Sequence, residues 1–186
     1  MAEELNRSHR ASPDVELKKT LQHFARDFLS RTEPMEAVSV QLRRQSRFTH
    51  EGITAKGHSV HLDEPREFGG TGRSPDPAEH LLAAVGSSLS VTLTAHAALR
   101  DIPIESLELR LQGRIDGRSF FDPRAWPGRG GVRDITIELT LVTPAPRGQI
   151  AELLRDALRA SPVVASLKKR PHVRLRMSCS LEIDPD

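Results

Sequence analysis

The residues with the clearest potential for chemistry are two adjacent serines in an apolar segment. Residues 74–90 read SPDPAEHLLAAVGSSLS, so Ser87 and Ser88 interrupt a run of small and apolar side chains. A serine hydroxyl becomes a hydrolase nucleophile when a base lies within hydrogen-bond reach. His80 and His96 are each eight residues from Ser88, which is about 12 Å along a helix rising 1.5 Å per residue. Neither histidine can therefore activate Ser88 directly.

The sequence around these serines also departs from a nucleophile motif. Gly86 is followed by residues 87–90, SSLS, without the second glycine of the G-x-S-x-G turn. A base would have to come from elsewhere, such as Glu67 or a histidine of a second subunit. The serines can equally be packing residues that donate to preceding helix carbonyls. A serine hydrolase therefore stays an alternative to a structural role.

Cys179 is the only cysteine, so the chain cannot form an internal disulfide. The sequence thus gives no sign of an oxidising compartment. Cys179 alternates with the apolar residues of the run Val173–Ile183, on the face that a strand would bury. A buried cysteine behaves as a small, inert hydrophobic residue. We expect Cys179 to be a packing residue.

Two histidines, His58 and His61, lie just before Asp63 and Glu64. Residues three apart on a strand point to opposite faces, so the pair cannot chelate one ion without a bend. No further residues complete a ligand set with the spacing of a structural site. We expect no metal and no cofactor.

A helix is predicted between Ser12-Pro13 and Pro34. Serine suits the N-cap, proline suits the first helical position, and Pro34 would end the helix. One face carries an apolar stripe at helical spacing, namely Leu17, Leu21, Phe24, Ala25 and Phe28. We divide the chain into residues 1–34, a tail with this amphipathic helix, and residues 35–186, the main domain. The helix is expected to pack internally or on a second subunit, and docking of another protein is the alternative.

Apolar alternation and helical periodicity organise the main domain. Strands are predicted around Val38–Leu42, in a second extended region Phe48–Leu62 turned by Gly52 and Gly57, and around Leu107–Leu111, Ile135–Leu141 and Val173–Ile183. Helices are predicted over Ala78–Leu99 and over Ile150–Leu158, the second broken near Ser161-Pro162. The order is helix, two strands, helix, two strands, helix, strand. This order favours an α+β domain with mostly antiparallel pairing.

Composition limits the core and the partners. Hydrophobic residues make up 37% of the chain and aromatic residues 4%, a thin supply that a partner subunit would complete. The net charge is +2, and the stacking aromatics typical of nucleic-acid surfaces are missing, so we expect no nucleic-acid partner. The polar N-terminus has no apolar signal core, and we find no run of about 20 apolar residues that would span a bilayer. The sequence predicts a cytoplasmic protein without a membrane partner.

Several motifs together resemble one family, that of osmotically inducible protein C and organic hydroperoxide resistance protein (OsmC/Ohr). The resemblance covers about residues 36–184 and is carried by Asp63-Glu64-Pro65, Gly69-Gly70, Ser74-Pro75-Asp76-Pro77-Ala78-Glu79, Leu81-Leu82-Ala83-Ala84 and Ser161-Pro162-Val163. It implies an intertwined homodimer in which antiparallel sheets wrap around long central helices, with active sites at the subunit interface. It also implies the reduction of organic hydroperoxides by a pair of cysteines and a dithiol. The helix predicted within residues 1–34 would be an addition to this fold.

The sequence departs from the family pattern at both cysteine positions. The first cysteine corresponds to Ser88 and the second to Ser161. Hydroperoxide reduction needs a thiolate that becomes a sulfenic acid and condenses with a second thiol. A serine hydroxyl is scarcely ionised near neutrality and has no comparable oxidised states. We therefore expect a redox-inactive relative without thiol peroxidase activity.

The resemblance also suggests an ion pair at the site. Glu67 falls where family members keep a glutamate before Gly-Gly, whose role is to hold an arginine beside the thiolate. Arg44 and Arg47 are both candidates for that arginine. We expect a small hydrophobic or lipid-like ligand near these three residues and Ser87, Ser88 and Ser161. A hydroperoxide reductase that uses a non-standard thiol is the main alternative, and a serine hydrolase is the other.

Overall fold

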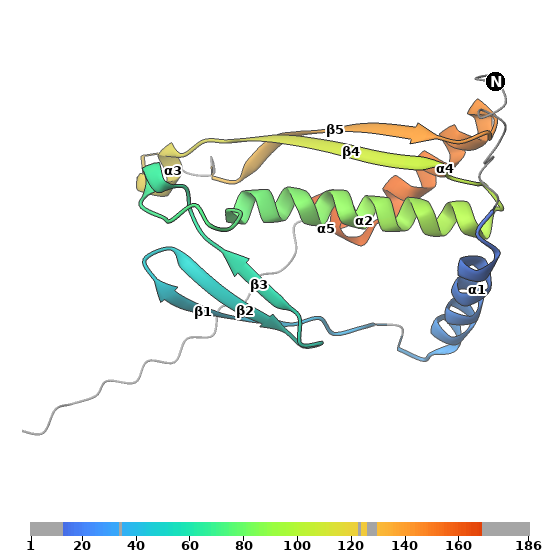
Figure 1. The fold of residues 1–186 in the computed structure, drawn as a ribbon, viewed down its shortest axis with the longest axis horizontal. Helices are drawn as coiled ribbons and strands as arrows, with labels where there is room; N and C mark the ends of the chain where they lie inside the picture. The colour runs from blue at the N-terminus through green and yellow to red at the C-terminus, as the bar shows by residue number, and fades with distance from the viewer. Residues whose placement is uncertain (1–12, 34, 123, 126–129, 169–186) are drawn as a thin grey trace, which may run out of the picture.

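The computed structural model describes residues 13–33, 35–122, 124–125 and 130–168 (Figure 1). Its elements, in chain order, are α1 (Val15–Ser30), β1 (Val40–Ser46), β2 (Thr49–Thr54), β3 (Ser59–Leu62), the 3-10 turn η1 (Arg66–Phe68), α2 (Pro77–Leu99), β4 (Ser106–Ile115), α3 (Arg118–Phe121), β5 (Val132–Val142), α4 (Arg147–Ala160) and α5 (Pro162–Lys168). Both sheets are antiparallel. The predicted α+β class is confirmed.

Helix α2 runs through the middle of the molecule, and its start follows from the sequence DPAE. The Asp76 carboxylate accepts a hydrogen bond from the Glu79 amide at 2.7 Å, and the Glu79 carboxylate accepts one from the Asp76 amide at 2.9 Å. This capping box, with Pro77 at the first helical position, satisfies amides that would otherwise lack partners. The predicted span Ala78–Leu99 is correct to one residue.

The hydrophobic core lies between α2, the β4–β5 hairpin and the C-terminal helices (Figure 1). Val85, Leu89 and Leu93 of α2 are almost wholly buried, as are Leu153 and Ala157 of α4. The inward-facing residues of the hairpin are partly buried against them, namely Leu107, Leu109, Leu111, Ile137, Leu139 and Leu141. The alternation read from the sequence therefore marks the face of the hairpin that packs on α2.

A second sheet has the order β1-β2-β3, where the sequence predicted two strands and not three. Gly57 does turn the chain, with φ +83°. Gly52 lies inside β2 instead, opposite Leu42 and Val60 of the flanking strands. A Cβ there would lie 2.6 Å from Leu42 Cδ2, so close strand contact, and not a turn, explains this glycine.

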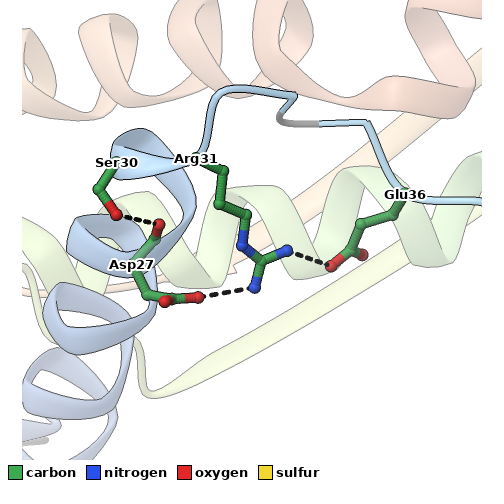
Figure 2. Close-up of polar contacts among 4 residues, drawn as sticks. All are labelled: Asp27, Ser30, Arg31 and Glu36. Atoms are coloured by element: carbon green, nitrogen blue, oxygen red, sulfur yellow. Dashed lines mark hydrogen bonds and ion pairs between the residues drawn. The ribbon is translucent and has the colours of Figure 1, made fainter.

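Helix α1 is confirmed as an amphipathic element, although its ends differ from the prediction. The N-cap is Asp14, whose carboxylate accepts from the Leu17 amide at 2.8 Å, and not Ser12. The helix ends at Ser30, before the predicted stop at Pro34. Figure 2 shows this end of the helix, where the Arg31 side chain lies between Asp27 and Glu36. Arg31 donates to Asp27 at 2.6 Å and to Glu36 at 3.4 Å. Because these groups are exposed, the two ion pairs contribute little to the stability of the folded protein.

The predicted helix over Ile150–Leu158 is α4, and the expected break at Ser161-Pro162 separates it from α5. The predicted strand Val173–Ile183, with Cys179, lies outside the described residues.

The prediction that no segment resembles a membrane span needs correction, because α2 is long and apolar enough to cross a bilayer by length and composition. The core helix of a globular protein passes the same test, so this is weak evidence for a membrane.

Candidate functional site

Ser88 and Ser161, 73 residues apart in the chain, face each other in the folded protein. Their Oγ atoms lie 2.9 Å apart, within hydrogen-bond distance, and either can be the donor. The Val163 amide also points to Ser88 Oγ, at 3.4 Å. Ser161 is fully buried at 0% exposure, and Ser88 is partly buried. The structure therefore joins two of the residues that the sequence predicted for the site.

The backbone around Ser161 explains why this contact is fixed. Ser161 caps the C-terminus of α4, where its amide donates to the Ala157 carbonyl at 2.9 Å. Its own carbonyl accepts from the Ala165 amide, also at 2.9 Å, as α5 begins. Pro162 sits at the start of α5, where a missing N–H is harmless. The serine is thus held at the junction of two helices that both pack on α2.

Ser87 behaves differently from its neighbour. Its side chain is exposed in the single chain, and its hydroxyl donates to the Ala84 carbonyl at 3.3 Å. This is the packing role expected of a serine within a helix. Of the two adjacent serines, only Ser88 reaches across to another element.

The serine pair has no activating base among the described residues. The hydrogen bonds of its two hydroxyls involve only each other and the Val163 amide. His80, which the sequence placed too far away, directs its Nδ1 at the Asp76 carbonyl at 3.2 Å. A nucleophilic role would need a histidine or carboxylate from outside this part of the chain.

The predicted pairing of Glu67 with Arg44 or Arg47 is not made within the chain. Glu67 is exposed on η1, Arg44 is exposed on β1, and Arg47 occupies the β1–β2 turn with φ 40°. None of the ion pairs among the described residues joins Glu67 to either arginine. The family resemblance places its active sites at a subunit interface, so the pairing of Glu67 with an arginine stays a prediction.

Asp63 is the buried polar residue whose role sequence reasoning missed. It is 1% exposed, and its carboxylate accepts from the amides of Thr71 and Arg73 at 3.0 and 3.2 Å and from the hydroxyls of Thr49 and Thr71. The hydrogen bond from the Thr71 hydroxyl, followed by those from backbone amides, holds the pKa of Asp63 well below its ordinary value despite burial. Asp63 therefore anchors the loop that leads into α2.

Gly70 closes the same loop. A Cβ on Gly70 would lie 1.8 Å from the carbonyl oxygen of Glu64, a distance that backbone atoms cannot accept. The Gly70 amide donates to the Pro65 carbonyl at 3.0 Å. The residues DEP and GG, which carried the resemblance, thus form one compact turn.

The nearby His58 and His61 are exposed, and no group of three potential metal ligands occurs among the described residues.

Comparison with known families identifies one family whose match includes α2 and the α4–α5 junction. The model of the family described as OsmC-like protein matches residues 70–176, more than half of the chain and including both serines. The chain belongs to the OsmC-like family. Among proteins with curated functions, no match to this OsmC-like protein was found.

Solved structures give the same fold. An OsmC-like protein of unknown function from Vibrio cholerae has a TM-score of 0.59 at 14% identity, covering 71% of this chain and 94% of its own. An OsmC-like protein from Mycoplasma pneumoniae has a TM-score of 0.58 at 18% identity, covering 75% and 91%. An organic hydroperoxide resistance protein from Legionella pneumophila has a TM-score of 0.52 at 15% identity, covering 73% and 91%. At these identities the likeness establishes the fold of the OsmC-like protein.

Proposed function

We propose that this OsmC-like protein is a cytoplasmic, homodimeric binding protein of the hydroperoxide and oxidative stress response family without thiol peroxidase activity. It would take a small hydrophobic ligand at the subunit interface, beside Ser88 and Ser161. The observation that carries the proposal is the hydrogen bond between these two side chains, 2.9 Å between oxygens. The pair stands at the positions where the family resemblance expects two cooperating cysteines.

The chemistry of oxygen supports the loss of peroxidase activity. In thiol peroxidation a thiolate attacks the O–O bond, is oxidised to a sulfenic acid, and is released by a second thiol. Ser88 and Ser161 have the required proximity, but a hydroxyl forms no sulfenic acid and no disulfide. The two side chains are therefore close enough for such a reaction, but they lack the sulfur atoms that would be oxidised and reduced.

Two exposed apolar surfaces support a homodimer. Only 33% of the most apolar window of α2 is buried within the chain, and Val91 on this helix is 69% exposed. All of β1 is exposed, with Val40 and Leu42 about half accessible at 52% and 51%. Surfaces of this kind are covered in functional assemblies. A second copy that packs on α2 and on the β1–β3 sheet would also enclose the partly buried Ser88.

The surroundings of the serine pair favour an apolar ligand. Val85 and Leu89 flank Ser88 on α2, and Val164 follows Ser161 on α5, all buried. One hydroxyl pair among aliphatic side chains offers weak polar contacts and no charge. Apolar surroundings with few polar groups are typical of sites for small hydrophobic molecules, so a site completed by a second subunit here would suit such a ligand.

Restoring the thiols tests the proposal. Consumption of cumene hydroperoxide is measured with excess dithiothreitol for the wild type and for the double variant S88C/S161C. We expect no catalytic turnover by the wild type and a measurable gain in the double variant, because its sulfur atoms would lie close enough to form a disulfide. The matched control is S87C/S161C, whose first thiol sits on the exposed side of α2.

Two further variants separate the alternatives. Turnover by the wild type that disappears in Cys179→Ala would overturn the proposal in favour of a non-standard thiol peroxidase. Hydrolysis of generic esters that disappears in Ser88→Ala would overturn it in favour of a serine hydrolase. Mass spectrometry of the purified wild-type dimer for a co-purifying apolar molecule, absent after Ser88→Trp fills the site, would support ligand binding.

A further inference from the structure

Four phenylalanines from distant segments gather near the start of α2. Phe68 of η1 is the centre, with ring centroids 5.5 Å from Phe48, 5.3 Å from Phe120 and 5.8 Å from Phe121. Phe120 and Phe121 belong to α3, which lies at the same end of the molecule as the start of α2 (Figure 1). These four rings are two-thirds of the six phenylalanines of a chain with one tryptophan and no tyrosine.

The cluster borders a surface cavity of about 360 Å³. Its apolar walls include Phe68, Phe120, Phe121 and Ile115, and its polar wall carries Glu64 and Asp76. Phe120, Phe121 and Ile115 are 66%, 74% and 58% exposed, so these apolar groups meet water in the single chain. The volume falls in the range of small-ligand sites, which runs from about 300 to 1,000 Å³.

The polar wall is acidic. The Asp76 carboxylate is already engaged with the Glu79 amide in the helix cap. Glu64 is partly buried, and burial, followed by the negative charges of Asp76 and Asp63, raises its pKa above the ordinary value. The nearby Arg118 forms an ion pair with Asp116 at 2.5 Å. The cavity therefore combines negative charge with aromatic faces.

This cavity is separate from the serine site. Pro77 lines it, and Ser88 lies eleven residues further along α2. At 1.5 Å per residue the two points are about 16 Å apart along the helix axis. No residue lining the cavity belongs to the serine pair or to the helix junction that holds it.

We propose that this cavity binds a small organic cation, a quaternary or tertiary ammonium group that carries a short apolar chain. Aromatic faces attract such cations, most strongly where water is excluded. The carboxylates of Glu64 and Asp76 supply the matching charge, and the chain of the ligand would cover Ile115 and the α3 rings. A neutral apolar ligand would bury Glu64 without a partner, and an anionic one would meet two carboxylates.

Calorimetric titration of the full-length protein with hexyltrimethylammonium tests the proposal. Hexanesulfonate, which has the same chain with the opposite charge, is the matched probe. We expect saturable binding of the cation and no binding of the anion. We also expect Glu64→Gln and the double variant F120A/F121A each to weaken binding of the cation about fivefold or more. Phe24→Ala, which removes an exposed ring from α1, is the control that leaves binding unchanged.

The outcomes distinguish this site from others. Amide NMR shifts on titration that centre on Gly117 and the α3 residues, and leave Ser88 and Ser161 unmoved, support the proposal. It is overturned if the two probes bind equally well, if neither binds, or if Glu64→Gln has no effect. Shifts that centre on the serine pair would also overturn it. None of these results depends on whether the serine site binds a ligand.

Discussion

Removing the Ser88 hydroxyl should destabilise the protein more than removing the Ser161 hydroxyl. In Ser88→Ala, the wholly buried Ser161 hydroxyl loses the partner that lies 2.9 Å away, and the Val163 amide loses an acceptor. In Ser161→Ala, the remaining Ser88 hydroxyl is only partly buried and keeps the Val163 amide. Ser88→Ala therefore leaves a buried hydroxyl and an amide without partners, whereas Ser161→Ala leaves the Ser88 hydroxyl with one partner.

The expected magnitudes follow from that difference. A typical hydrogen bond contributes about 0.5–1.5 kcal/mol, whereas a buried polar group left without a partner costs about 1–3 kcal/mol. We expect a loss of about 2 kcal/mol for Ser88→Ala and about 1 kcal/mol for Ser161→Ala. The double alanine variant leaves no orphaned hydroxyl, so it should lose about 2 kcal/mol, and the coupling energy should be about 1 kcal/mol.

Urea unfolding at one fixed protein concentration measures these free energies, since any association would otherwise shift the midpoint. Ser87→Ala is the matched control, because its hydroxyl donates only to a carbonyl of its own helix. The reasoning is refuted if the two single losses simply add in the double variant. It is also refuted if Ser161→Ala is the more destabilising change.

The remaining predictions concern the loop before α2 and the core. Gly70→Ala should cost about 1–3 kcal/mol or more, because its Cβ would lie 1.8 Å from a backbone oxygen. Gly148→Ala, with nothing within 4 Å of its Cβ, should be nearly neutral, and urea unfolding of both variants measures the difference. Since the pKa of Asp63 is lowered in the folded state, its contribution should be complete above the ordinary carboxyl value of about 4 and decline as the pH falls further. Asp63→Asn should flatten that decline in urea midpoints measured across the acid range, and an unchanged slope would contradict the assignment. Leu93→Ala should lose about 2–5 kcal/mol, since this side chain is 0% exposed; a loss below 1 kcal/mol in urea unfolding would show that the core re-forms around the gap.

Elements with strong local signals were predictable from the sequence. The start of α2 follows from a capping box written in four consecutive residues, Asp76 to Glu79. The β4–β5 hairpin follows from a strict alternation of leucines and isoleucines with polar residues. The proximity of Ser88 and Ser161 also followed from sequence, although through a family resemblance and not through local chemistry.

Features that depend on distant packing were not predictable. Gly52 was interpreted as a turn, because the steric limit imposed by Leu42 on the next strand is invisible in a linear sequence. The contact of Phe68 with Phe120 joins segments about fifty residues apart, and no periodicity signals it. Asp14 replaced Ser12 as the N-cap because several adjacent residues can cap equally well.

The oxygen pair between α2 and the α4–α5 junction has a consequence beyond lost reactivity. Two sulfur atoms in this place would give the molecule two covalent forms, one cross-linked and one open, in proportions set by the surrounding redox potential. Two serine oxygens cannot form such a cross-link, so the contact between them exists in one covalent form only. Because a serine hydroxyl forms neither a sulfenic acid nor a disulfide, peroxides and reductants should leave the contact between Ser88 and Ser161 unchanged. The position of α2 against the α4–α5 junction should therefore be the same in a cell under oxidant attack as in a cell at rest.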